Sequence, residues 1–342
     1  MEKKGAIPAV NTMQQLADYV GLSRQTLSKY FNEPQQVGYN TRILIQSAIE
    51  KTGFRPNLFA SNLKRNKSKV IGIIIPSITD PFYMQLVSRI STIAEMSGYF
   101  TFTLPSNGKL SIEADAVAKL QSMNVAGALV VPLGKDSVQT KLRQMEDSLP
   151  IVYLDTPPIH DASFIGTDNR QGITLLVNYL CQKGNPPAFL AMPEINRNAN
   201  SRLQAYQEAM EQNKEKPSVL IADGGMDWQF ETYGHQKTTR WLSDKSKYQA
   251  LLCANDRLAY GAFLAAWEAG ISVGLNDGAL RIAGHDNHPL AAYTCPPLTT
   301  AAQNYDTIAT SAVETLLAHI IGDLSAANQQ LIPMTLVKRQ SA

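Results

Sequence analysis

The sequence predicts a small all-α head followed by an α/β body that is built from two doubly wound parallel-sheet lobes. Three short amphipathic segments before about residue 55 indicate the helical head. After residue 70, β-branched runs such as "VIGIII" alternate with helical stretches, which is typical of a parallel sheet covered on both faces. The alternation restarts after "SFIGTDNRQG". Two such units predict two lobes that face each other across a cleft.

The charge of the chain is divided unevenly between these parts. The whole chain has 342 residues, of which 44% are hydrophobic and 18% charged, so it is long enough for two or three domains with real cores. Residues 1–69 contain 11 Lys and Arg against four Asp and Glu, whereas the remainder contains 20 against 25. A basic head on a mildly acidic body indicates that the head meets a polyanion.

Several features indicate the cellular compartment. No apolar run approaches the roughly 20 residues that a membrane span needs. The first residues, "MEKKGAIPAVNTMQQ", lack the apolar core of a signal peptide. The three cysteines, Cys181, Cys253 and Cys295, are scattered and form no disulfide or metal pattern. We therefore expect a cytoplasmic protein without a membrane partner.

The head, residues 1–55, has the pattern of a helix-turn-helix unit. The segment "MQQLADYV" predicts a first helix, Gly21 ends it, and a second helix should run from Arg24 to about Phe31. The expected N-caps are Asn11 or Thr12 for the first helix and Ser23 for the second, and a third helix should start at Asn40 or Thr41. The second helix would place its early residues against base edges in a major groove. Spacing and charge alone also allow an ordinary solvated face on a small bundle.

The stretch from Met13 to Ser68, which begins "MQQLADYVGLSRQTLSKYFNEP", resembles the DNA-binding head of the lactose-repressor (LacI/GalR) family without a gap. The resemblance implies base contacts by Arg24, Gln25 and Lys29, because Arg and Lys can donate to guanine and Gln can pair with adenine. It implies phosphate contacts by Ser23, Thr26, Ser28, Asn32 and Thr41. Lys29 stands where the family usually has Arg, so a forked donor is replaced by a point charge.

Residues 56–69 form the expected hinge. Composition alone allows a plain basic linker here. By the resemblance, "NLFASNLKRN" is a hinge helix that pairs with its copy from a second subunit and enters the minor groove. Ala60, Leu63 and Lys64 would face the DNA, with Leu63 as the wedge between base steps.

The body, residues 70–342, carries no motif that commits it to catalysis. It has no GxGxxG, no P-loop and no GxSxG elbow. The pair His285 and His288 in "HDNH" ends a strand and turns directly into Pro289, without a metal-site pattern. We expect no catalytic residue, no metal and no cofactor, and interpret the body as a binding domain.

Segments of the body resemble the same family, among them "IGIIIPSITDPFY", "ANDRLAYGAFLAAWEAG", "IAGHDN" and "PPLTTAAQ". The resemblance implies a periplasmic-binding-protein-like core with crossovers near Thr167, Gln303 and Pro333. Lobe 1 would comprise about residues 70–167 and 303–332, and lobe 2 about residues 168–302 and 333–342. Closure of the lobes on a ligand is the expected motion.

The resemblance also implies an effector site between the lobes. The expected residues are Ser77, Asp80, Phe82, Asp155, Arg202, Trp228, Asn255, Asp286 and Gln303. Arg202 and Asp286 suit the recognition of hydroxyl groups, because a guanidinium donates and a carboxylate accepts. Arg202 could instead be a surface cation and Asp286 a turn carboxylate. Trp228 could be a packed tryptophan, with Phe230 against the ligand in its place.

The hinge pairing that the resemblance implies leads us to expect a homodimer on a palindromic operator in double-stranded DNA, with its contact along the helix after Asp80. The leading hypothesis is a repressor of a carbohydrate-utilisation operon that a small sugar releases from DNA. One alternative is a regulator that a nucleobase-type corepressor tightens on DNA. Two others, a solute-binding receptor and an enzyme on a sugar or nucleoside, belong to different classes.

Overall fold

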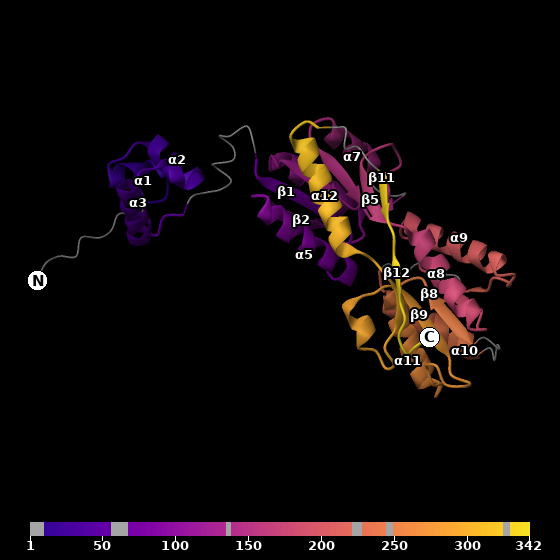
Figure 1. Ribbon diagram of the computed structural model, residues 1–342. Helices are drawn as coiled ribbons and strands as arrows, with labels where there is room; N and C mark the ends of the chain where they lie inside the picture. Colours follow the sequence, from indigo (N-terminus) through magenta and orange to yellow (C-terminus); the bar gives the residue numbers. More distant parts are fainter. Residues whose placement is uncertain (1–9, 56–67, 135–137, 221–227, 244–248, 324–328) are drawn as a thin grey trace, which may run out of the picture. The chain divides into compact units, whose positions relative to one another are not determined.

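The computed structural model describes residues 10–55, 68–134, 138–220, 228–243, 249–323 and 329–342. The chain separates into two compact units, residues 1–68 and 69–342. Figure 1 shows the helical unit and the two-lobed α/β unit. The predicted fold class, a helix-turn-helix head with a body of two parallel-sheet lobes, is confirmed. Within the described ranges, no helix combines the length and the apolar character that a membrane span requires.

The helices of the head are α1 (Met13–Val20), α2 (Arg24–Asn32) and α3 (Tyr39–Thr52), with a short 3-10 helix, η1, at Pro34–Gln36. Thr12 caps α1 in a capping box with Gln15, and Ser23 caps α2 by accepting from the amide of Thr26. Gly21 has a φ of 72°, the left-handed conformation that reverses the chain between α1 and α2. The core of the head contains Val10, Leu16, Ala17, Leu27, Ile45, Ala48 and Phe54.

One expected boundary in the head is wrong. Helix α3 begins at Tyr39, not at Asn40 or Thr41, and no side chain caps it. The backbone of Gly38 is extended and its carbonyl accepts from the amide of Arg42, so the helix starts directly after the glycine. Thr41 therefore lies inside the first turn.

The sheet of lobe 1 has the strand order β11-β5-β4-β3-β1-β2, and all neighbouring pairs are parallel. The strands are β1 (Val70–Ile75), β2 (Phe100–Pro105), β3 (Gly127–Val130), β4 (Ile151–Leu154), β5 (Phe164–Thr167) and β11 (Gln329–Ile332). Helices α5 (Pro81–Met96) and α12 (Tyr305–Ile320) cover one face. Helices α6 (Leu110–Ser122) and α7 (Gln139–Glu146) cover the other. Successive residues of β1 pack into the two clusters alternately, as a buried parallel strand requires.

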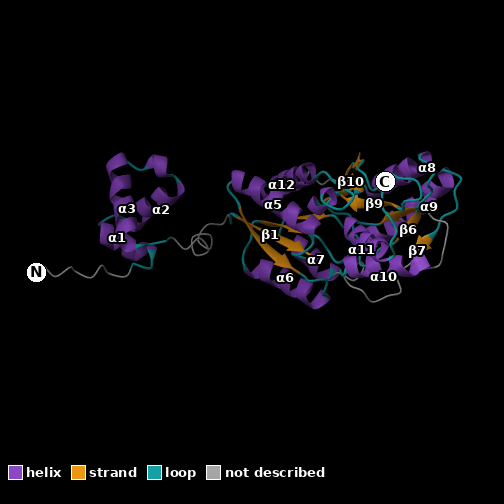
Figure 2. Cartoon of the chain, turned by 90° about the horizontal axis from the view of Figure 1, so that it is seen from below, coloured by secondary structure: helices purple, strands orange, loops and turns teal. Residues whose placement is uncertain are grey.

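The sheet of lobe 2 has the order β12-β10-β9-β8-β6-β7, with β12 antiparallel to β10 and the other pairs parallel. The strands are β6 (Ala188–Leu190), β7 (Val219–Leu220), β8 (Ala250–Cys253), β9 (Arg281–Asp286), β10 (Thr299–Ala302) and β12 (Thr335–Val337). The helices are α8 (Asn169–Gln182), α9 (Arg197–Gln212), α10 (Phe230–Ser243) and α11 (Asp256–Glu268), with a 3-10 helix, η3, at Pro289–Ala292. Helices α8 and α9 pack together, and so do α10 and α11, as Figure 2 shows for the second pair.

Two glycines bring α10 and α11 unusually close. A Cβ at Gly234 would lie 2.3 Å from the carbonyl oxygen of Leu258, and one at Gly261 would lie 2.1 Å from that of Glu231. Any larger side chain at either position would force the helices apart. This close approach places Glu231 of α10 beside the start of α11.

The described chain passes between the lobes three times. It crosses after β5 at Thr167, after β10 at Gln303, and between β11 and β12 at Pro333. In Figure 1, β11 and β12 form one yellow path from one lobe to the other. Three short connections beside each other are the usual construction of a hinge for lobe closure.

Candidate functional site

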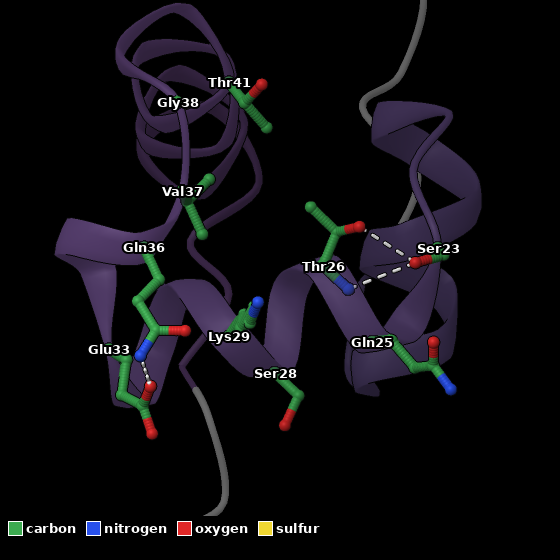
Figure 3. Close-up of a pocket in the computed structure, with 10 residues that line it drawn as sticks. All are labelled: Ser23, Gln25, Thr26, Ser28, Lys29, Glu33, Gln36, Val37, Gly38 and Thr41. Carbon is green, nitrogen blue, oxygen red and sulfur yellow. Dashed lines mark hydrogen bonds between the residues drawn. The ribbon is translucent and has the colours of Figure 1, made fainter.

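The exposed face of α2 forms one wall of an open hollow in the head. The hollow has a volume of about 630 Å³ and is lined by Ser23, Gln25, Thr26, Ser28, Lys29, Glu33, Gln36, Val37, Gly38 and Thr41 (Figure 3). The side chains of Gln25 and Lys29 are exposed, whereas Leu27 on the opposite side of α2 is fully buried. Helix α2 therefore holds its polar residues outward by burying its apolar stripe.

The predicted DNA-contacting residues of the described head lie on or beside this face. Arg24 is exposed in the first turn of α2, next to the lining residues. Ser23 and Thr26 are 2.9 Å apart at their hydroxyls, so they are oriented by each other (Figure 3). Asn32 ends α2, and its side chain is not among the described parts. The predicted hinge residues Ala60, Leu63 and Lys64 lie outside the described residues.

Four lining residues of the hollow were not among the predicted contacts: Glu33, Gln36, Val37 and Gly38. Gln36 donates a hydrogen bond to the carboxylate of Glu33, and both line the hollow beside Lys29. A carboxylate here opposes a phosphate but can accept from the amino group of cytosine. Glu33 directly follows α2 and Gln36 ends the short helix η1, so both lie close to Lys29 in the sequence, but no sequence pattern identified them as contacts.

The second candidate site is the cleft between the lobes. It is lined by Asp80, Phe82, Tyr83, Asp155, Met192, Ile195, Asn196, Asn198, Arg202, Trp228, Phe230, Asn255, Asp286 and Gln303. Eight of the nine predicted effector residues are among them, and Ser77 is not. The hydroxyl of Ser77 lies 3.0 Å from that of Thr79. The cleft is narrow, with a volume of about 40 Å³.

Asp286 is the centre of a buried polar network on the lobe 2 side. Its Oδ1 accepts from Arg202 Nη2 at 3.3 Å and from Gln303 Nε2 at 2.7 Å. His285 Nδ1 lies 2.8 Å from the same oxygen. Burial alone would raise the pKa of Asp286, but the guanidinium of Arg202 and the contact with His285 lower it well below its usual range. The carboxylate is therefore charged at any pH near neutrality.

Arg202 is fixed by three acceptors. Its Nε donates to Asn169 Oδ1 and its Nη1 to the carbonyl of Ala254, both at 2.7 Å, in addition to the contact with Asp286. Arg202 is 5% exposed and Asp286 is 6% exposed. The alternative of a surface cation is therefore wrong for Arg202, because its guanidinium is buried and paired inside the lobe. Asp286 does end a strand, with a φ of 112°, but its carboxylate is buried and paired with Arg202.

Asp155 lies on the lobe 1 side of the cleft without an ion pair among the described residues. Its Oδ2 accepts from the hydroxyl of Tyr83 and its Oδ1 from Asn198 Nδ2, both at 2.9 Å. Burial raises the pKa of Asp155 to about 6, although Arg202 and the Tyr83 hydroxyl act in the opposite direction. Asn198 belongs to lobe 2, so its hydrogen bond to Asp155 crosses the cleft. Sequence reasoning identified Asp155 but neither of its partners.

A second link between the lobes joins Asp80 to Arg257. Asp80 caps α5 by accepting from the amide of Phe82, and its other oxygen accepts from Arg257 Nη1 at 2.9 Å. Arg257 also donates to both oxygens of Glu231, at 2.6 and 2.7 Å. Arg257 was within the quoted "ANDRLAYG", but only the fold shows that it reaches lobe 1.

Aromatic rings form one wall of the cleft. The ring centroid of Trp228 lies 5.9 Å from that of Tyr83 and 5.7 Å from that of Phe230. Phe82 stacks edge-on against Tyr83 at 5.0 Å. Trp228 and Phe230 both line the cleft, so the sequence-based choice between them is not exclusive. Asn255 also lines it while it caps α11.

The cleft offers hydrogen-bonding groups and flat apolar faces. Among the residues that the structure describes, no three His, Cys, Asp or Glu side chains are grouped so that they could hold a metal ion. The arrangement suits the binding of a small polar ring.

Known proteins and structures resemble the chain along nearly its whole length. Residues 12–57 match the family model for bacterial regulatory proteins of the lacI family, and residues 177–342 match that of the periplasmic binding protein-like domain. The lactose operon repressor of Escherichia coli K12 is 28% identical over 96% of this chain and 90% of its own length. The ribose operon repressor of the same strain is 27% identical over 97% and 99%. The PurR-type transcriptional repressor of Proteus mirabilis is 27% identical over 96% of both chains.

A solved structure of the Lac repressor dimer bound to operator and the anti-inducer ONPF superimposes with a TM-score of 0.81. It is 26% identical and covers 96% of this chain and 98% of its own. The relatives are named as repressors and not as enzymes, in agreement with the absence of catalytic motifs. The helix-turn-helix head, the two-lobed body and both family matches lead to one conclusion: the chain belongs to the LacI family of bacterial regulatory proteins.

Proposed function

We propose that this LacI-family repressor binds operator DNA through α2 and is released from it by a small sugar-type inducer in the cleft. The observation that most supports a sugar as the effector is the buried set of polar side chains Arg202, Asp286, Gln303 and Asn255. It presents donors and acceptors in fixed positions, which is what recognition of vicinal hydroxyl groups requires. The names of the lactose and ribose operon repressors among the relatives support a carbohydrate-utilisation operon as the target.

In the head, Arg24, Gln25 and Lys29 are the proposed base contacts. Exposed donors in the first two turns of a capped α2 match the geometry of a recognition helix. Ser23, Thr26, Ser28, Asn32 and Thr41 are the proposed phosphate contacts, and Ala60, Leu63 and Lys64 the proposed minor-groove contacts. Phosphate contacts would set the register on the duplex, whereas the base contacts would set the sequence.

Effector control requires that the lobes move. The cleft has about 40 Å³, whereas small-molecule sites commonly have roughly 300–1,000 Å³. An effector therefore enters only when the lobes separate, which breaks the Asp80–Arg257 and Asp155–Asn198 contacts. We propose that this change in lobe geometry alters the placement of the two heads on the operator, as a shift between two states.

The proposed assembly is a homodimer. Met84 on α5, the helix of the predicted dimer face, is 54% exposed. Lobe 2 carries an apolar surface hollow along α11 and η3 that includes Trp267, which is 77% exposed, and Tyr293, which is 82% exposed. Large apolar groups gathered at the surface are typical of an interface between chains. The Lac repressor dimer structure supports the same assembly here.

A nucleobase corepressor is the second candidate. The rings of Trp228, Tyr83 and Phe230 could stack on a flat base, and PurR-type repressors are among the relatives. The two candidates have opposite effects on operator affinity, because an inducer weakens the operator complex and a corepressor strengthens it.

A thermal-shift screen against neutral sugars and nucleobases tests the proposed function. A ligand that binds only the folded state raises the melting temperature. We expect a sugar to raise it, and Arg202→Ala and Asp286→Ala to abolish the shift. Arg170→Ala is the matched control, because Arg170 forms an exposed ion pair with Glu208 on α8 and α9. A shift with nucleobases alone contradicts the sugar inducer and favours the corepressor.

A further inference from the structure

We infer that the cleft selects effectors that carry no net negative charge, and that Asp155 is the residue that sets this selection. The effector is thus a neutral or amine-bearing polar ring, and phosphorylated or carboxylate-bearing rings are rejected. This inference rests on the proposed function of the cleft as the effector site. It holds for a sugar and for a nucleobase alike.

The charges that line the cleft are mostly negative. Asp80, Asp155 and Asp286 are lining carboxylates, and Arg202 is the single lining cation among the described residues. All four side chains are buried to at least nine-tenths. Water therefore screens these charges less than it screens charges on the surface.

Arg202 and Arg257, the cations that contact the lining carboxylates, are already engaged by carboxylates of the chain itself. Arg202 donates to Asp286, Asn169 and the carbonyl of Ala254. Arg257 donates to Asp80 and to both oxygens of Glu231. An anionic effector could gain either guanidinium only by competing with a carboxylate that already holds it.

His285 adds no positive charge behind Asp286. Burial, together with Arg202, lowers the pKa of His285 to about 4. Its ring is therefore neutral near pH 7. Asp256 lies deeper in the lobe and accepts from Thr300 Oγ1 and the amide of His288, and burial raises its pKa to about 7. Neither group offers a counter-charge to an anion in the cleft.

Three helix N-termini at the cleft, those of α5, α9 and α11, are also occupied. An uncapped N-terminus would be a ready anion site, because its amide groups point at the ligand. Asp80 accepts from the amide of Phe82 at the start of α5, Asn196 from that of Ala199 in α9, and Asn255 from that of Leu258 in α11. Each of these capping residues lines the cleft, so these three N-termini are closed to a phosphate by the chain's own side chains.

Asp155 is the carboxylate that remains available to a ligand. Its described partners, Tyr83 and Asn198, are neutral donors, and together they satisfy only part of its acceptor capacity. An amine or hydroxyl would find an acceptor there, whereas a phosphate or carboxylate would meet a negative charge that has no directly bonded cation among the described residues. Two like charges about 6 Å apart in a partly buried site weaken binding by about 100-fold.

The charge of the cleft can be measured without knowing the effector. Ile195 lines the cleft, so Ile195→Cys places a thiol there, in a background of Cys181→Ser and Cys295→Ser, while Cys253 is buried. The probes are a cationic and an anionic methanethiosulfonate of similar size at low ionic strength. The measured quantity is the reaction rate of the cationic reagent divided by that of the anionic one. We expect this ratio to be about 10-fold or more higher for the cleft thiol than for free glutathione. Adding Asp155→Asn should reduce this preference, and adding Asp306→Asn, an exposed control on α12, should not. The inference is overturned if the rate ratio of the cleft thiol equals that of glutathione, or if the cleft thiol reacts faster with the anionic reagent.

Matched ligands separate this inference from the proposed function. A thermal-shift panel compares each of glucose, ribose and galactose with its amine, acid and phosphate forms, and adenine and hypoxanthine with their nucleotides. A neutral sugar or amino sugar as the best binder supports both proposals. A neutral nucleobase supports the charge selection and contradicts the sugar inducer. A phosphate or acid form as the best binder contradicts the charge selection, whichever ring carries it.

Discussion

Replacing Asp155 by Asn removes one proton-binding group from the cleft while keeping the size of the side chain. Asp155 has a φ of 57°, a left-handed conformation that Asn tolerates as well as Asp does. The replacement therefore adds no backbone strain. Its effect on stability should depend on pH, because the proton of Asp155 is held more tightly in the folded chain than in the unfolded one.

The expected size follows from the pKa. Burial raises the pKa of Asp155 from 3.8 to about 6. A group whose pKa is raised on folding contributes stability below its unfolded pKa and loses it as the pH rises through the folded value. The free energy of unfolding of the wild type should thus fall by ~3 kcal/mol from a pH well below the unfolded pKa to a pH well above the folded one. Of this fall, ~2 kcal/mol develops between pH 4.5 and 7.5. Asp155→Asn does not lose this contribution.

Urea unfolding of both proteins at a series of pH values tests the reasoning. The quantity to follow is the free energy of unfolding of Asp155→Asn minus that of the wild type, which should rise by ~2 kcal/mol from pH 4.5 to 7.5. Asp306→Asn, whose residue is 77% exposed, should give a difference that changes by less than ~0.5 kcal/mol. A flat or falling difference for Asp155→Asn would refute the argument that a desolvated carboxylate lies in the cleft.

Three further predictions test other parts of the structure. Leu27→Ala, at a fully buried position of the head, should lower the free energy of unfolding of the head by ~3 kcal/mol. Circular dichroism of the full chain follows this unfolding, and a loss below ~1 kcal/mol contradicts the packing of α2. Arg257→Ala removes the cation that holds Asp80 and should enlarge the radius of gyration in small-angle scattering as the lobes separate; an unchanged radius contradicts the link between the lobes. Trp267→Lys with Tyr293→Lys should raise the dimer dissociation constant at least about 100-fold in sedimentation equilibrium, since two exposed apolar anchors are lost; an unaltered constant removes this surface from the interface.

Much of the fold was predictable because its signals are local. The capping hydroxyls of Thr12 and Ser23 and the turn at Gly21 define the first two helices, and they appear as predicted. Alternating strands and helices define the two sheets in the same way. The start of α3 was misplaced because Gly38 provides only a carbonyl and a bend, and no capping side chain marks it.

The partners within the cleft were not predictable, because they depend on how distant segments meet. Asp155 could be identified after a strand, yet Tyr83 and Asn198 approach it from α5 and α9. Arg257 reaches Asp80 from the start of α11, a helix that packs closely against α10 at Gly234 and Gly261. A sequence pattern gives the type of each residue, but the fold decides which carboxylate receives which donor.

Operator binding with and without ligand tests the central claim most directly. A fluorescent duplex, selected from random DNA by the full chain, is titrated in an anisotropy assay before and after addition of the compound that most raises the melting temperature. We predict that this compound weakens operator binding at least about 10-fold, and that Arg202→Ala retains operator binding but loses the response. An operator affinity that stays unchanged while the ligand occupies the cleft would contradict the account, because the cleft would then bind a molecule without controlling the head.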